Sequence, residues 1–286
     1  MQHFKIFIAL TRLNKPIGFM LLFWPCSWGL AYAYSVNQDY NLFIYYLLLF
    51  FLGSVLMRSA GCIVNDIVDK DFDKKVKRTR KRPIASKKIS VNRSLLYVLI
   101  LCSLAFLVLI QFNFLTILLG MGSMIFAFLY PFMKRITYWP QLFLGITFNW
   151  GLIMAWASIN NNISPEIITL YLSAIFWTLG YDTIYGAQDM SDDEIIGLKS
   201  TSIKFKKNIK MFVATCYFTT LLILFYLFYD YINLNIFTLF LILFSMSLIF
   251  QIKKFKITNA KSCLDSFKIN NMSGILLFTM ILLINF

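Results

Sequence analysis

Charged side chains are scarce in this chain of 286 residues, and acidic ones are the scarcest. Charged residues make up 14% of the sequence, with 13 Asp and Glu against 27 Lys and Arg, and hydrophobic residues make up 59%. Soluble domains carry about 25% charged and about 45–50% apolar residues, so this composition excludes that class of protein. We infer a membrane protein with little room for a separate soluble domain, and we expect a single domain over 1–286.

Histidine and cysteine are also rare, and their scarcity excludes several kinds of site. His3 is the single histidine and lies in the N-terminal tail, which argues against a His-rich metal site or a His-based active site. The cysteines number five and include no CxxC pair, so they predict neither a zinc site nor a disulfide framework. We expect them to be reduced packing residues.

Long apolar runs are what the sequence has in abundance. A span of about 20 apolar residues crosses a hydrocarbon core of roughly 30 Å. Reading these runs against charged or turn-rich breaks predicts nine helices, over 16–35, 41–64, 94–112, 114–132, 140–158, 166–187, 210–229, 233–251 and 271–286. The fold class is therefore an all-α integral membrane bundle of about nine transmembrane helices. Seven or eight spans remain alternatives, because the third and fourth runs touch and the ninth is short.

The net charge of +14 is concentrated in alternate linkers between these runs. The linkers at 36–40, near 113, at 159–165 and at 230–232 contain no Lys or Arg, and the remaining linkers hold nearly all of them. Under the positive-inside rule the N-terminus and the basic loops are cytoplasmic, and the C-terminus is outside. The N-terminal residues resemble neither a signal peptide nor an organellar presequence, so we expect a bacterial inner (plasma) membrane.

Nine of the thirteen acidic residues fall in two segments, 65–73 and 182–194. Each segment lies where a long apolar run, the second or the sixth, passes into a basic loop. If the helices continue, side chains three and four residues apart share one face. These predicted walls contain Asp66, Asp69 and Asp73 in the first segment, and Asp182, Tyr185, Asp189 and either Asp192 or Asp193 in the second.

Crowded carboxylates near a low-dielectric membrane require a cation, and hard oxygen ligands suit Mg²⁺. Two such walls that face each other can clamp a diphosphate through Mg²⁺, with basic side chains neutralising the remaining charge. The candidate basic residues are Lys77, Arg78, Arg82, Lys134, Arg135 and Lys199. A diphosphate at a charged mouth and an apolar tail between helices predict a phosphorylated lipid as substrate. Departure of the diphosphate leaves an allylic cation, which aromatic faces can stabilise.

Arg58 differs from the other basic residues, because it is predicted about two turns before the end of its helix. A cation at that depth is costly unless it is paired. We expect Arg58 to lie near Asp69 or to bind a carboxylate of the acceptor.

Four segments resemble the UbiA-type 4-hydroxybenzoate polyprenyltransferases of ubiquinone synthesis, over about 12–205. They are RLNKPIG followed by WP at 24–25, MRSAGCIVNDIVDKDFDKKVKRTRKRPIAS, YPFMKRITYWPQLFLG and YDTIYGAQDMSDDEIIGLKSTSIKF. The two family motifs, NDxxDxxxD and DxxxD, fall on Asn65, Asp66, Asp69 and Asp73, and on Asp189 and Asp193. Two departures are visible, since Asn14 stands where aspartate is expected and Asp71 adds a carboxylate inside the first motif.

The resemblance implies a nine-helix bundle with a cytoplasmic cap over the active site, and both motifs binding Mg²⁺-diphosphate. It also implies transfer of a polyprenyl group from polyprenyl diphosphate to the 3-position of 4-hydroxybenzoate. The expected partners are these two substrates and the lipid bilayer, with no nucleic acid and no obligate protein. Other acceptors are alternatives within the superfamily, namely dihydroxynaphthoate, homogentisate, and haem or chlorophyll precursors. A transporter is the alternative from another class, but transporters place acidic groups near the midplane, whereas these gather at one face.

Overall fold

The computed structural model describes residues 2–285, and that range folds into helices with no β-strand. Nine helices in this range are long and apolar enough to cross a membrane. They are α2 (Ile17–Asn37), α3 (Tyr40–Val68), α5 (Val91–Leu109), α6 (Phe114–Ile136), α7 (Pro140–Asn160), α8 (Pro165–Gly186), α11 (Ile209–Leu227), α12 (Ile236–Lys254) and a ninth over Ala260–Asn285. The predicted all-α bundle of nine spans is confirmed.

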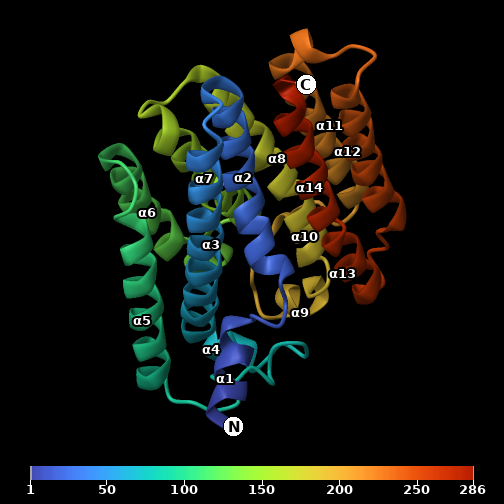
Figure 1. Cartoon of the computed structure of the whole chain (residues 1–286). Coiled ribbons are helices and arrows are strands. Elements are labelled where there is room, and N and C mark those ends of the chain that lie inside the picture. The colour runs from blue at the N-terminus through green and yellow to red at the C-terminus, as the bar shows by residue number, and fades with distance from the viewer. Residues whose placement is uncertain (1, 286) are drawn as a thin grey trace.

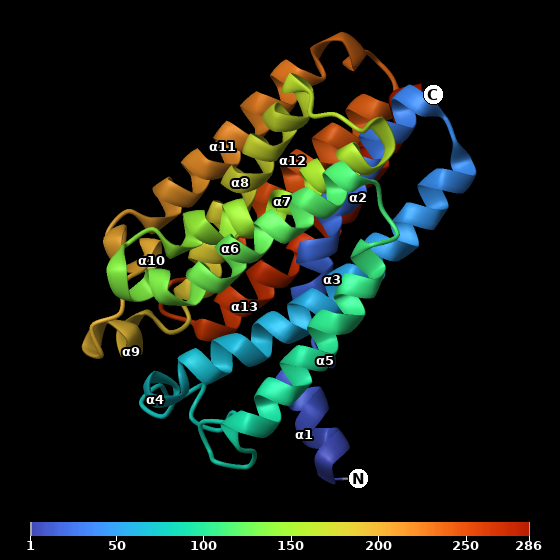
Figure 2. The ribbon, with the colours of Figure 1, turned by 90° about the vertical axis from the view of Figure 1, so that its left-hand side faces the viewer.

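Shorter helices lie between and beside the spans. They are α1 (Gln2–Thr11), α4 (Lys70–Asp73), α9 (Met190–Ile195), α10 (Thr201–Lys204) and the 3₁₀ turn η1 (Tyr229–Tyr231), while the ninth span is built from α13 (Ala260–Lys268), α14 (Asn270–Leu282) and η2 (Leu283–Asn285). Helices α1, α4 and α9 gather at the end of the bundle that holds the N-terminus (Figure 2). The largest boundary errors lie in three helices: α3 extends to Val68 rather than 64, α6 extends to Ile136 rather than 132, and the last span begins at 260 rather than 271.

The turns at the other end of the bundle are set by polar caps. Asp39, Asn113 and Ser164 each accept a bond from a backbone N–H of the first turn of α3, α6 and α8, which satisfies a donor that the helix leaves free. Gln38 and Asn161 end α2 and α7 in the left-handed conformation. These turns put the basic linkers at the opposite end, and the odd number of spans places the two termini at opposite ends (Figure 1).

Helices α2, α7 and α8 form the centre of the bundle. Trp28 of α2 and Trp177 of α8 are fully buried, and their ring centroids lie 4.9 Å apart. Gly29 packs so closely on α7 that an added Cβ would lie 2.3 Å from the carbonyl oxygen of Leu152. Small residues at helix contacts allow this close approach in membrane bundles. Helices α5 and α6 are the outer members, since most of their apolar side chains are not buried.

A second, smaller apolar cluster fixes the segments near the N-terminus. It joins Leu10 of α1, Ala60 and Ile63 of α3, Ile84 of the loop after α4, and Leu101 of α5. This cluster packs α1 on α3 and holds the basic loop of 74–90 against the bundle.

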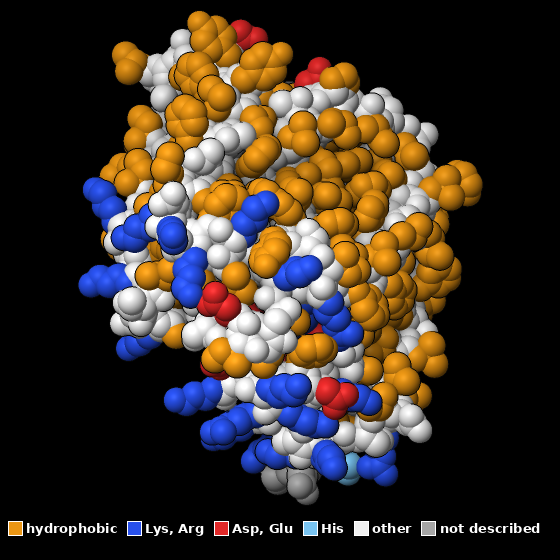
Figure 3. Space-filling model, turned by 180° about the vertical axis from the view of Figure 1, so that it is seen from behind, with side chains coloured by type: hydrophobic (Ala, Val, Ile, Leu, Met, Phe, Trp, Pro, Cys, Tyr) orange, Lys and Arg blue, Asp and Glu red, His pale blue; other side chains and the backbone are white. Residues whose placement is uncertain are grey.

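Charge is segregated along the molecule. On the face shown in Figure 3, Lys and Arg side chains occupy the half that contains the N-terminus, while hydrophobic side chains cover the remainder. Apolar side chains exposed over the outer helices match a lipid environment. The chain is a multi-pass membrane protein.

Candidate active site

A cavity of about 1460 Å³ runs along the inside of the bundle. Asp69 and Asp189 line one end, where α3 and α8 finish, and Phe50 and Phe112 line the cavity towards the other end. Along α3, the path from residue 50 to residue 69 covers ~28 Å at 1.5 Å per residue. The cavity is therefore charged at the basic end of the molecule and apolar across most of the bundle.

The first acidic wall forms where α3 stops. The backbone N–H of Asp69 donates to the carbonyl of Asn65 at 2.9 Å and closes the helix, and α4 then begins at Lys70. The carboxylate of Asp69 is almost fully buried, and it forms ion pairs with Lys134 and, at 3.4 Å, with Arg135. The predicted continuous stripe was wrong in one respect, because the helix breaks at Asp69 before the chain reaches Asp73.

Asp73 belongs to the same wall and has its own basic partner. Its Oδ2 accepts from Arg82 Nη1 at 2.9 Å. Burial raises the pKa of Asp73, the Arg82 guanidinium opposes that rise, and Asp66 and Asp69 add to it. The ion pair therefore keeps a negative charge in a place where burial disfavours it.

The second acidic wall follows α8 and meets the first. Asp189, just before α9, accepts from the guanidinium of Arg78, with Nε 2.8 Å from Oδ1. The same guanidinium lies 3.4 Å from the hydroxyl of Tyr185 and over its ring. The backbone N–H of Lys77 also donates to Asp192 at 3.1 Å. The loop that follows the first wall thus lies directly against the second, and the two walls face each other at one end of the molecule.

Two carboxylates that line the cavity form no ion pair with a Lys or Arg of the described residues. Within residues 2–285, no Lys or Arg lies within ion-pair distance of Asp182 or Asp193. Burial and the neighbouring Asp189 raise the pKa of Asp193 to about 6. A divalent cation close to Asp193 would remove that penalty.

The acidic residues do not form a metal site by themselves. In the part of the chain that the structure describes, no group of three or more His, Cys, Asp or Glu is placed to hold an ion. Magnesium is commonly held by one or two carboxylates together with water and substrate phosphates. Asp69 on one wall and Asp189 and Asp193 on the other supply three carboxylates, more than one such metal needs, so these walls fit magnesium shared with a diphosphate.

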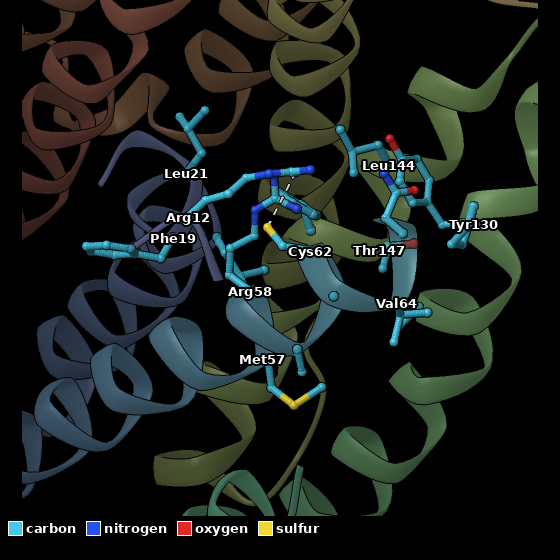
Figure 4. Close-up of a pocket in the computed structure, with 18 of the residues that line it drawn as sticks. Arg12, Phe19, Leu21, Met57, Arg58, Cys62, Val64, Tyr130, Leu144 and Thr147 are labelled. Atoms are coloured by element: carbon cyan, nitrogen blue, oxygen red, sulfur yellow. Dashed lines mark hydrogen bonds between the residues drawn. The ribbon is translucent and has the colours of Figure 1, made fainter. Parts of the chain in front are cut away.

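Arg58 lies deeper in the cavity, on the α3 wall. Figure 4 shows Arg58 and Arg12 extending towards the same space, with Tyr130, Leu144 and Thr147 across it. Its Nε is buried with no hydrogen-bond partner in the described residues, and the guanidinium lies 5.2 Å from the centroid of the Phe148 ring. Arg58 is therefore a half-buried cation, with a shielded Nε, that faces a cavity.

Twelve of the fifteen predicted site residues line the cavity, and three do not. The twelve are Arg58, Asn65, Asp69, Asp73, Arg78, Arg82, Lys134, Asp182, Tyr185, Asp189, Asp193 and Lys199. The three that lie outside it are Asp66, Lys77 and Arg135. Of these, Arg135 donates to the Val68 carbonyl at 2.8 Å, which holds the end of α3.

Some polar residues of the cavity were not predicted. They include Arg12, Lys15, Lys81 and Gln188. Arg12 and Lys15 belong to the RLNKPIG segment, so the resemblance of that segment was a signal for a wall of the site. Lys81 lies in a loop whose course depends on tertiary contacts.

Comparison with known proteins gives relatives over most of the chain. The human and Caenorhabditis elegans proteins named "4-hydroxybenzoate polyprenyltransferase, mitochondrial" are similar to it. The human protein is 47% identical over 211 residues, which are 73% of this chain and 56% of that protein. The worm protein is 38% identical over 276 residues, which are 96% of this chain and 77% of that protein. The chain spans only about half the length of several of the curated relatives it matches.

Solved structures show the same fold at low sequence identity. A UbiA homolog from Aeropyrum pernix K1 has a TM-score of 0.76 at 22% identity, covering 92% of this chain and 96% of that one. A UbiA homolog from Archaeoglobus fulgidus bound to DMAPP and Mg²⁺ has a TM-score of 0.69 at 17% identity, covering 96% of this chain and 99% of that one. The model of the UbiA prenyltransferase family matches residues 22–274. The predicted resemblance is confirmed, and the chain belongs to the UbiA prenyltransferase family.

Proposed function

We propose that this chain transfers a polyprenyl group from a polyprenyl diphosphate to the 3-position of 4-hydroxybenzoate in ubiquinone biosynthesis, with Mg²⁺ as cofactor. The reaction releases diphosphate and the proton that ring carbon 3 carried. The name shared by the curated relatives supports this reaction, and the family model covers both acidic segments. The Archaeoglobus homolog bound to DMAPP and Mg²⁺ supports the donor class and the metal. We treat 1–286 as one catalytic domain.

The observation that carries the proposal is the meeting of the two acidic walls at the mouth of an apolar cavity. Arg78 joins them, because it follows the first wall in sequence and binds Asp189 of the second. A diphosphate held between the walls places its attached hydrocarbon tail in the cavity between the helices, where water is excluded.

Several residues at the mouth are placed to stabilise the departing diphosphate. Lys134, Arg78 and Arg82 are cations within reach of an anion at the mouth, and they stabilise the charge that develops as the C–O bond breaks. Asp69, Asp189 and Asp193 would hold magnesium, which would supply further charge neutralisation to the leaving group. Lys199, which lines the same mouth, bonds to the Ile136 carbonyl at 3.1 Å and adds positive charge at the rim.

The acceptor is proposed to lie deeper, against Arg58. Its guanidinium, with Nε buried and unpartnered within the described residues, suits the carboxylate of 4-hydroxybenzoate. Replacing Arg58 by glutamine is expected to raise the KM for 4-hydroxybenzoate by about 10- to 100-fold, the range for a lost hydrogen bond to a charged group. The KM for the donor should change by less than about 3-fold, as measured by steady-state kinetics with each substrate varied.

Arg93→Gln is the matched control for Arg58→Gln, because Arg93 is exposed on α5 and does not line the cavity. It should leave both KM values unchanged. Equal increases of the two KM values in Arg58→Gln would contradict the assignment of Arg58 to the acceptor carboxylate.

One assay tests the proposed reaction as a whole. Purified protein is supplied with labelled 4-hydroxybenzoate, Mg²⁺ and polyprenyl diphosphates of several lengths, and the product is identified by mass spectrometry. Parallel reactions contain dihydroxynaphthoate or homogentisate. We expect 3-prenylated 4-hydroxybenzoate; preference for another acceptor would overturn the substrate, and absence of diphosphate release with every acceptor would overturn the enzyme.

We propose a bacterial plasma membrane with the basic end in the cytoplasm, and α4, α9 and α10 as the cap over the site. The support is the concentration of Lys and Arg at that end. The curated relatives named above are mitochondrial, so the membrane and the orientation both need a direct test. An impermeant maleimide added to intact cells should label Asn161→Cys and not Lys207→Cys. Lys207→Cys should be labelled only after the cells are opened. Labelling of Lys207→Cys from outside would overturn the orientation.

A further inference from the structure

Asp66 differs from the other carboxylates of the two motifs. Asp69, Asp73, Asp189 and Asp193 line the cavity, and Asp66 does not. The Asp66 side chain is 1% exposed. Within the described residues, one of its oxygens is shared by two arginines and the other is buried without a partner.

The two arginines come from segments that are distant in sequence. Arg12 Nη2 lies 2.5 Å from Asp66 Oδ1, and Arg82 Nη1 lies 3.1 Å from the same oxygen. Arg12 directly follows α1 in a left-handed backbone conformation, with a φ of 56°, and its Nη1 also contacts Cys62 Sγ at 3.6 Å. Asp66 therefore ties the segment after α1 and the basic loop after α4 to the same point on α3.

Both arginines face the cavity, while the carboxylate that holds them lies behind it. Arg12 and Arg82 line the cavity, and Arg82 Nη1 also donates to both oxygens of Asp73, at 3.1 and 2.9 Å. The position of Arg82 thus depends on Asp66 and in turn fixes Asp73. Lys15, three residues after Arg12, lines the same wall, so the wall formed by the N-terminal segment shares this anchor.

A divalent cation has poor access to Asp66. To reach Oδ1 it would have to displace two guanidinium groups, and breaking a buried ion pair leaves uncompensated charge. Oδ2 has no partner within the described residues, but it is buried and Asp66 does not line the cavity. Asp69, by contrast, reaches the cavity directly. The four motif carboxylates that line the cavity are sufficient for metal and diphosphate without Asp66.

We propose that Asp66 is a positioning residue rather than a Mg²⁺ ligand. It holds Arg12 and Arg82 at the cavity wall and, through Arg82, orients Asp73 towards the diphosphate. This role rests on the proposed function, because it assigns the mouth of the cavity to a prenyl diphosphate.

The test compares Asp66→Asn with Asp69→Asn in the purified full-length protein. For Asp66→Asn, the KM for prenyl diphosphate should rise by about 10- to 100-fold, since the cations that meet the diphosphate lose their anchor. The Mg²⁺ concentration for half-maximal activity at saturating donor should shift by less than about 3-fold, because no ligand is lost. An increase in the Mg²⁺ requirement equal to that of Asp69→Asn would overturn the proposal.

A double variant keeps the test decisive if Asp66→Asn does not fold. Arg12→Gln/Asp66→Asn removes both charges, so no buried charge is left unpaired. We expect the double variant to be impaired no more than Arg12→Gln alone, and calorimetry still to detect binding of Mg²⁺ with inorganic diphosphate. Loss of that binding would overturn the proposal. If the unaltered protein itself fails to bind Mg²⁺ with diphosphate, the proposed function is what fails.

Discussion

Replacing Asp69 by asparagine is expected to lower turnover by about 1000-fold or more, on the order of the loss seen when an electrostatic group of an active site is removed. Asparagine keeps the shape of a side chain that is almost fully buried, but it removes the charge that faces Lys134. The side chain of Lys134 is 27% exposed, so it remains partly hydrated and the protein should stay folded. Product formation under saturating substrates measures the loss, and circular dichroism verifies the helical fold.

Asp71→Asn is the control, because it makes the same chemical change two residues away. The Asp71 side chain is 68% exposed, pairs with Lys74 on the surface and does not line the cavity. Its replacement should leave turnover within about 2-fold, as for most surface changes. If Asp69→Asn retained more than a tenth of the activity, the metal clamp would have to be abandoned.

Inorganic diphosphate is expected to raise the affinity of the protein for Mg²⁺ by about 100-fold, near the upper end of common coupling between two ligands. Without diphosphate, Asp69 and Asp189 are already paired with Lys134 and Arg78, which a metal would have to displace. A bound diphosphate gives Lys134 and Arg78 another anion to pair with. The carboxylates of Asp69 and Asp189 are then free to bind Mg²⁺. Tryptophan fluorescence during Mg²⁺ titration, with and without diphosphate and corrected for Mg²⁺ bound in solution, measures the difference.

Arg78→Gln should change the affinity for Mg²⁺ and the affinity for diphosphate in opposite directions. Mg²⁺ alone should bind more tightly, because Asp189 loses its competing cation, while diphosphate should bind more weakly. Lys206→Gln is the matched control, since Lys206 pairs with Glu194 near the surface, with both side chains about half exposed. That control should move neither affinity. A change of both affinities in the same direction in Arg78→Gln would refute the exchange of partners.

The spans could be predicted because burial in lipid demands long apolar runs, and the nine runs in the sequence became the nine spans. Helix α1 was not predicted, because a segment of ten residues with three polar side chains and one lysine is too short to cross a membrane. It is held by packing of Leu10 against Ala60 and Ile63, a contact over about 50 residues of sequence. The end of α3 was also missed, since residues 65–68 continue the helix although the apolar run has stopped.

Most residues of the site could be predicted from the sequence, but the contacts between them could not. Helical spacing and the family motifs placed Asp69 and Asp189 on the walls, because these depend on local geometry. The contact of Arg78 with Asp189 depends on how the loop over 74–90 folds back, which no short-range pattern determines. For the same reason Arg12 was overlooked and Lys77, whose backbone binds Asp192, was chosen for its side chain.

The contact of Gly29 with the carbonyl oxygen of Leu152 bears on how such a protein can diverge. The two helices that meet there also line the cavity, through Cys26 on one and Met154 on the other. Their separation is set by main-chain atoms as long as residue 29 carries no Cβ. Side chains that line the interior can therefore change and reshape the space for the hydrocarbon without altering that separation, provided that position 29 stays glycine.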